Sequence, residues 1–263
     1  MRDEERKCVY GPVKSWRLGN SLGIDLLFVD SICSFACVYC QLGKINRLTT
    51  KRGIFVPTAR VMGDLSSSDW KDADVITFSG SGEPTLAANL GEAIAEIRRA
   101  THKPIAVLTN SSLLGDTAVR RELSFADIVF CKLDAWGDDS LRRIDRPAAG
   151  IELDSIISGI RAFRNDFSGT LAIQTMLLSR PANNELREFS GILKSISPDE
   201  VQVNLPLRPI PDEWIPESRG NLPIDAPAHR LRTISPEAAA GIGRQIGQMT
   251  GLRVITPFDE QAA

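Results

Sequence analysis

Eleven consecutive residues carry the densest chemical signal in the chain: Ser31-Ile32-Cys33-Ser34-Phe35-Ala36-Cys37-Val38-Tyr39-Cys40-Gln41. Three of the five cysteines fall in this stretch, at Cys-x3-Cys-x2-Cys spacing. A structural zinc site needs four ligands, usually offered as two separated pairs, and the sequence has no second pair. Three clustered thiolates can instead hold three irons of a cubane cluster and leave the fourth iron without a protein ligand. The spacing therefore predicts an iron–sulfur centre with one open iron.

Simpler interpretations of the same cysteines are a partial zinc site, a disulfide, or thiols packed as small apolar groups. With aromatic Tyr39 just before Cys40, the spacing resembles the signature of the radical S-adenosylmethionine (SAM) superfamily. The resemblance implies that Cys33, Cys37 and Cys40 ligate a 4Fe-4S cluster whose open iron binds SAM, with Tyr39 flanking the adenine. It also implies reductive cleavage of SAM to methionine and a 5′-deoxyadenosyl radical, which abstracts hydrogen from a substrate.

Composition limits the alternatives. The chain has 263 residues, 43% of them hydrophobic, which suffices for a sizeable core. Its net charge of −2 provides no global basic field and counts against a large nucleic-acid footprint. The charged first residues are unlike a secretory signal, and no apolar window reaches the length of a membrane span. We expect a cytoplasmic protein with no membrane contact, in a reducing compartment that suits clustered thiols.

Apolar runs alternate with amphipathic segments along the chain. We expect strands over 24–29, 74–78, 104–109, 127–134, 171–178 and 201–205, with a short last strand over 252–256. Helical spacing marks 86–97, 153–163, 186–196 and 236–249. This order, with no antiparallel hairpin signal, predicts a parallel α/β fold. The resemblance implies a partial (β/α)6 TIM-type barrel with a radical SAM core.

The chain is expected to form a single domain over 1–263. Residues 1–205 make the barrel core, and 206–263 hold a proline-rich loop and the C-terminal helix. Six prolines between 206 and 227 prevent a long regular element. Segments of this kind are usually functional or disordered, and Arg208 with Trp214 favours a lid that faces the substrate.

Two glycine-rich segments precede the cysteines and narrow the resemblance. They are Tyr10-Gly11-Pro12-Val13 and Leu18-Gly19-Asn20-Ser21-Leu22-Gly23, which we interpret as turns before the first strand. Together with Tyr39-Cys40-Gln41-Leu42-Gly43, they resemble the subgroup known as wyosine-synthetase-related iron–sulfur oxidoreductases.

A second motif follows the strand expected over 74–78: Ser79-Gly80-Ser81-Gly82-Glu83. Glycine lets the backbone approach a ligand closely, and the carboxylate of Glu83 can accept a hydrogen bond from an ammonium group. The family has a Gly-Gly-Glu element here, which binds the methionine amino group of SAM. The resemblance therefore implies that Ser81, Gly82 and Glu83 bind that group, with Ser81 in place of the first glycine.

Other candidates have two interpretations each. Asn110 and Ser111 follow the third strand, where they can bind the ribose or carboxylate of SAM or cap the next helix. Lys132 and Asp134 share one face of the fourth strand, as a buried ion pair or as ribose or substrate contacts. Of the remaining cysteines, Cys8 and Cys131, too few for a second cluster, Cys131 is expected to pack in the core.

Three functions stay open. The first is a radical enzyme acting on a small molecule, the second is one modifying a tRNA base, and the third is a non-catalytic electron-transfer protein. Glu83 argues against the third, because an electron carrier has no use for an ammonium acceptor. The resemblance also implies an electron donor such as flavodoxin or ferredoxin. A local positive stretch can bind such a donor or a phosphate-bearing substrate, or be a solvated loop: Lys44, Arg47, Lys51 and Arg52.

Overall fold

The computed structural model describes residues 6–216, 219 and 225–259. Within them one sheet has the strand order β1-β2-β5-β6-β7-β8-β9-β12. Neighbours from β2 to β12 are parallel, and β1 alone is antiparallel to its partner. The predicted parallel α/β fold is confirmed. The strands are β1 (Val9–Ser15), β2 (Gly19–Ile24), β5 (Val75–Phe78), β6 (Ile105–Thr109), β7 (Ile128–Lys132), β8 (Thr170–Met176), β9 (Glu200–Asn204) and β12 (Val254–Ile255).

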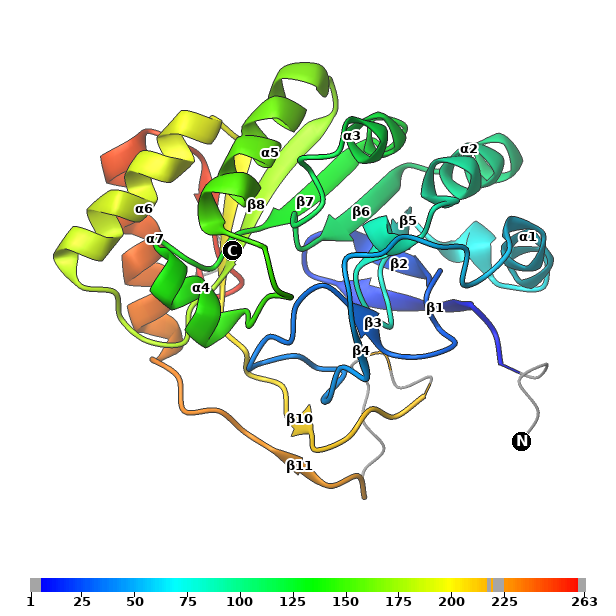
Figure 1. Ribbon diagram of the computed structural model, residues 1–263, viewed down its shortest axis with the longest axis horizontal. Helices are drawn as coiled ribbons and strands as arrows, with labels where there is room; N and C mark the ends of the chain where they lie inside the picture. The colour runs from blue at the N-terminus through cyan, green and yellow to red at the C-terminus, as the bar shows by residue number, and fades with distance from the viewer. Residues whose placement is uncertain (1–5, 217–218, 220–224, 260–263) are drawn as a thin grey trace.

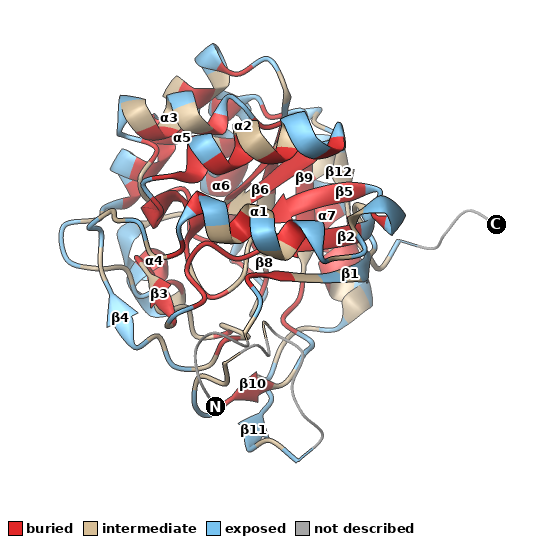
Figure 2. Cartoon of the chain, turned by 90° about the vertical axis from the view of Figure 1, so that its right-hand side faces the viewer, coloured by how far each residue is buried: buried red, intermediate tan, exposed pale blue. Residues whose placement is uncertain are grey.

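Helices other than α4 cover the outer face of this sheet (Figure 1). Each buries one stripe of side chains, so that buried colour faces the strands and exposed colour faces outward (Figure 2). Because β1 and β12 are the two edges of the sheet, the barrel is open on one side. The helices are α1 (Thr58–Ser66), α2 (Leu90–Thr101), α3 (Thr117–Leu123), α4 (Asp138–Ile144), α5 (Leu153–Asp166), α6 (Asn183–Ile196) and α7 (Pro236–Thr250), with 3-10 turns η2 (Trp70–Asp72) and η3 (Pro84–Leu86).

Two short strand pairs lie on the other side of the sheet, together with α4 (Figure 1). Parallel β3 (Ile32–Cys33) and β4 (Arg47–Leu48) close the cysteine loop, and antiparallel β10 (Ile210–Pro211) and β11 (Ala228–His229) close the proline-rich segment. Part of that segment, 217–218 and 220–224, lies outside the described residues. Among those described, no helix is long and apolar enough to cross a membrane.

The core has two parts. The larger lies between sheet and helices, and the smaller lies on the inner side of the strands. The smaller part consists of Val75, Ala106, Phe130 and Ala172, with Leu18, Leu108 and Ile128 packed against them. Three of these residues, Leu18, Leu108 and Phe130, also line the cavity described below.

The expectation for the first strand was wrong in its residue bounds and in its pairing. The strand β2 occupies 19–24 rather than 24–29, and residues 9–15 pair with it as an antiparallel hairpin. Glycine and proline suggested turns, but tertiary packing decides here. A Cβ on Gly23 would lie 2.1 Å from the ring of Tyr10, so the glycine lets that ring cross the strand. Pro12 is tolerated because β1 is an edge strand.

Candidate active site

The cysteine loop is fixed on both sides. On one side Ile32 and Cys33 pair with β4, and on the other Ala36 and Val38 donate backbone hydrogen bonds to carbonyls at the C-terminal end of α4. A turn closed by the N–H of Cys40 on the carbonyl of Cys37, at 3.0 Å, brings the last two cysteines together. Cys33, Cys37 and Cys40 all line one cavity of about 700 Å³. The loop therefore presents three thiols to one space.

The thiols fit a cluster better than a single ion. Across the described residues, no three His, Cys, Asp or Glu side chains converge closely enough to share one metal ion. A cubane suits such spacing because each thiolate bonds a different iron. Burial raises the pKa of all three thiols, so the positive charge of the metal must offset the desolvation of the thiolates. Cys33 Sγ accepts N–H groups from Phe35 and Asn110, at 3.4 and 3.5 Å, as cluster sulfurs commonly do.

The Ser-Gly-Glu motif is joined by backbone hydrogen bonds to Ile32, the residue before the first cysteine. The N–H of Ile32 donates to the carbonyl of Ser81 at 2.9 Å, and the N–H of Glu83 donates to the carbonyl of Ile32 at 3.1 Å. Gly82, at φ +155°, lies between these bonds, and a Cβ there would be 1.6 Å from the carbonyl oxygen of Ile32. Only glycine permits this approach, which explains how two motifs forty residues apart form one site.

Glu83 is 2% exposed and its carboxylate is almost fully hydrogen-bonded. Oε1 accepts three bonds, from the N–H and hydroxyl of Thr85 at 3.0 and 2.6 Å and from the hydroxyl of Thr109 at 2.6 Å. Oε2 accepts one, from the N–H of Asn110 at 2.6 Å, and retains a free lone pair. Burial raises the pKa of Glu83, while these donors act in the opposite direction by stabilising its charged form.

Ser81 turns away from the cavity and is held by a residue that the sequence analysis missed. Its N–H and hydroxyl donate to Asp25 Oδ2 at 3.0 and 2.7 Å. That carboxylate is fully buried, and its charge is matched by Arg219 at 3.1 Å. Burial raises the pKa of Asp25, and Arg219 opposes this effect most strongly. The available signal was a charged residue inside the otherwise apolar run 22–28.

Two further carboxylates, those of Asp134 and Asp145, lie next to Cys37 and Tyr39. The hydroxyl of Tyr39 donates to Asp134 and, at 3.3 Å, to Asp145, while Cys37 Sγ lies 3.5 Å from Asp145. Lys132 pairs with Asp134 at 3.2 Å, as the ion-pair interpretation expected, and its ammonium lies 4.8 Å from the centre of the Tyr39 ring. Burial raises the pKa of Asp145, and the neighbouring charge of Asp134 raises it further.

The remaining candidates divide. Asn110 lines the cavity and joins the two motifs, because its amide donates to Ser34 Oγ at 2.8 Å while its N–H binds Glu83. Ser111 is fully buried at φ +70° and is not among the described cavity-lining residues; its N–H donates to Thr109. Neither caps a helix, since Asp116 caps α3. Cys131 is fully buried, as expected.

The positive stretch after the cysteines also divides. Arg52 has a structural role, because its guanidinium binds the carbonyls of Thr85 and Ala87 and the carboxylate of Glu122. Lys44, Arg47 and Lys51 are exposed beside the cysteine loop. Three of the four charges therefore stay available to a partner, and the fourth supports the Glu83 turn.

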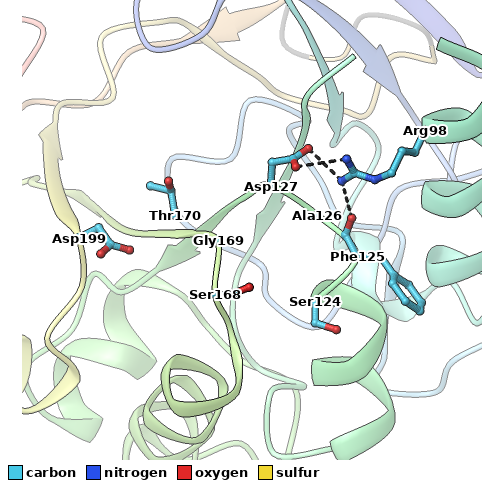
Figure 3. Close-up of a pocket in the computed structure, with 9 residues that line it drawn as sticks. All are labelled: Arg98, Ser124, Phe125, Ala126, Asp127, Ser168, Gly169, Thr170 and Asp199. Atoms are coloured by element: carbon cyan, nitrogen blue, oxygen red, sulfur yellow. Dashed lines mark hydrogen bonds and ion pairs between the residues drawn. The ribbon is translucent and has the colours of Figure 1, made fainter. Parts of the chain in front are cut away.

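A second pocket, of about 670 Å³, lies at the opposite end of the strands (Figure 3). Its charged groups are already used. Arg98 binds Asp127 at 2.9 Å and the carbonyl of Phe125 at 2.7 Å, and Asp199 pairs with Arg164 at 2.7 Å. Chemistry in α/β barrels sits at the carboxyl ends of the strands, where the cysteines are, so we assign this pocket no catalytic role.

Comparisons with known proteins agree with this geometry. The family model described as the radical SAM superfamily matches residues 29–189. The chain is 46% identical over 251 residues to a UPF0026 protein of Synechocystis sp., covering 94% of this chain and 95% of that protein. A UPF0026 protein of Methanocaldococcus jannaschii is 35% identical, over 78% of this chain and 65% of its own. The crystal structure of Streptococcus suis SuiB bound to S-adenosylmethionine aligns with TM-score 0.61 and 12% identity, over 89% of this chain and 50% of that one.

The chain belongs to the radical SAM superfamily, whose enzymes use a 4Fe-4S cluster and SAM. Within it, the chain is similar to the UPF0026 proteins over nearly its whole length. The narrower resemblance to wyosine-synthetase-related oxidoreductases stays a prediction.

Proposed function

We propose that this protein cleaves SAM reductively and that the resulting radical takes hydrogen from a small-molecule substrate. The observation that supports this most directly is the backbone pairing of Ile32 with residues 81–83. This pairing brings the cysteine loop and the turn that carries Glu83 to the same cavity. The volume of this cavity, about 700 Å³, falls in the range typical of small-ligand sites.

Each residue has a defined part. Cys33, Cys37 and Cys40 hold the cluster, and Glu83 Oε2 offers the free lone pair for the methionine ammonium of SAM. When bound, the cluster supplies the electron that cleaves SAM to methionine and a 5′-deoxyadenosyl radical. Asn110 fixes the distance between the two motifs, and Tyr39 forms a wall beside the cluster. The barrel excludes water that would compete with the substrate.

The electron must come from a reductant, and radical SAM enzymes require one. We propose that an acidic protein, such as flavodoxin or ferredoxin, docks on Lys44, Arg47 and Lys51. These exposed cations follow the cysteine loop directly and are free of the structural role taken by Arg52. Complementary charge of this kind raises the rate of association and weakens with salt.

The test is anaerobic reconstitution, reduction with dithionite and measurement of 5′-deoxyadenosine after SAM is added. We expect slow cleavage even without substrate. Glu83→Gln should keep the iron content of the wild type but bind SAM at least about tenfold more weakly, because the ammonium loses a charged acceptor. Absence of 5′-deoxyadenosine would leave only an electron-transfer protein. Salt-dependent binding of bulk tRNA would favour the tRNA alternative over a small molecule.

A further inference from the structure

The cavity that contains the cysteines also has a strongly cationic lining. Five positively charged side chains line it, against the single carboxylate of Glu83: Lys14, Arg17, Lys132, Arg208 and Arg219. The chain as a whole carries a net charge of −2, so this excess is local. A cavity that concentrates one sign of charge selects ligands of the opposite sign.

Two of these charges are matched and two of the arginines are not. Lys132 pairs with Asp134 and Arg219 pairs with Asp25, at 3.2 and 3.1 Å. Arg17 has a buried Nε with no hydrogen-bond partner anywhere in the described structure. Its guanidinium lies against two aromatic rings instead, 5.3 Å from the centre of Trp16 and 5.5 Å from that of Phe130. Arg208 is exposed and has no carboxylate partner among the described residues.

An arrangement of this kind is unfavourable without a ligand. A buried guanidinium that lacks a counter-charge loses its hydration without compensation. Burial lowers the pKa of Arg17 to about 10, and the nearby charge of Arg208 lowers it further in the same direction. Two like charges in the lining of one cavity, one of them close to two aromatic rings, are suited to a carboxylate or phosphate that accepts hydrogen bonds from both.

The position of Arg17 separates it from the cysteines along the direction of the strands. Arg17 lies in the turn that enters β2, while Cys33 follows the carboxyl end of the same strand. A strand of six residues spans roughly 15–20 Å between its two ends. Arg208 follows the carboxyl end of β9, near the other edge of the sheet, and lines the same cavity as Arg17. A ligand anchored there would extend into the cavity toward the cluster.

We propose that Arg17 and Arg208 bind the anionic group, a phosphate or a carboxylate, of the small molecule that reacts with the radical. This inference rests on the proposed function and specifies its substrate class. The aromatic rings of Trp16 and Phe130 orient the guanidinium of Arg17, and the arginines hold the substrate in place, away from the reacting bond.

The test uses the full-length, reconstituted protein and two simple probes, inorganic phosphate and malonate, titrated calorimetrically at constant ionic strength. We expect one or both to bind the wild type and the control variant Arg121→Gln equally, because Arg121 is exposed on α3. Arg17→Gln and Arg208→Gln should each weaken binding at least tenfold. Preference for phosphate or malonate identifies the anionic group.

SAM also carries a carboxylate, so its affinity is measured in the same variants. Unchanged SAM binding and unchanged slow formation of 5′-deoxyadenosine in Arg17→Gln would support a substrate site. An equal loss of SAM affinity would overturn the proposal, because the arginines would then serve the cofactor. Anion binding that is insensitive to both substitutions would also overturn it. Arginine-dependent anion binding in a wild type that never cleaves SAM would overturn the proposed function alone.

Discussion

The two ends of the cavity differ in how completely their polar groups are satisfied. At the cofactor end, Glu83 accepts four hydrogen bonds, and Asp25 is matched by Ser81 and Arg219. At the other end, Arg17 keeps a buried nitrogen without a hydrogen-bond partner, and the exposed Arg208 adds a second positive charge to the lining of the same cavity. The carboxylates of Glu83 and Asp25 are already held by protein groups, whereas Arg17 lacks a counter-charge.

This difference separates two tasks. A site that must hold a reactive cofactor in one geometry benefits from side chains that are already locked by their neighbours. A site that must capture and release a changing ligand keeps its binding groups available, at a cost in stability. Four substitutions test this contrast, in order of decreasing expected effect.

Cys37→Ala should abolish the cluster and the formation of 5′-deoxyadenosine, because two cysteines cannot hold the cubane that three hold. The measured iron content should fall from about four irons per chain to a small fraction of that value. Cys131→Ser is the matched control. Cys131 is fully buried and is not among the described residues that line the cavity of the three cysteines, so iron content should stay unchanged. Equal loss of iron in both variants would contradict the ligand assignment.

Gly82→Ala should reduce the free energy of unfolding by about 4 kcal/mol or more, because the new Cβ would overlap the carbonyl of Ile32. Urea denaturation measures the change. Gly191→Ala is the control: this exposed glycine in α6 has open space around it, and alanine there should stabilise by about 0.5–1 kcal/mol. If Gly82→Ala leaves the stability unchanged, the backbone of Gly82 does not lie against the carbonyl of Ile32.

Asp25→Asn should cost about 3 kcal/mol, because Arg219 is left with a buried, unmatched charge. The double variant Asp25→Asn with Arg219→Gln should recover part of that loss, since both charges are then gone. A double-mutant cycle on urea midpoints gives the coupling. Additive losses would mean that the carboxylate and the guanidinium do not interact. The buried charge of Asp25 would then not be matched by Arg219.

Arg17→Gln should raise the free energy of unfolding by about 1 kcal/mol in buffer without phosphate or carboxylate. The sign follows from the depressed pKa of Arg17: the folded state disfavours the charged form, so below about pH 10 the charge is destabilising, and stability rises as the pH increases above about 10. Urea midpoints at pH 7 measure the effect. A less stable variant would mean that the guanidinium already has a stabilising partner.

Local patterns identified the elements that depend on local chemistry. The parallel strands after residue 74 and the amphipathic helices α5, α6 and α7 lie close to where their periodicity placed them. The antiparallel hairpin over 9–24 was missed because its strands are held by contacts between distant residues, such as Tyr10 with Ser79 at 2.9 Å. Glycine and proline indicate turns until a neighbouring ring or an edge position makes use of them.

The same division applies to the site. Cysteine spacing and the Ser-Gly-Glu motif indicated a cluster and an ammonium acceptor from short stretches of sequence, since the ligands of each lie within a single loop. Only the tertiary structure placed Asp25 next to Ser81, Asp145 next to Cys37, and Arg17 in the same cavity lining as Arg208. These residues are separated by 56, 108 and 191 positions, and no local periodicity reports a contact that exists only after the barrel has closed around it.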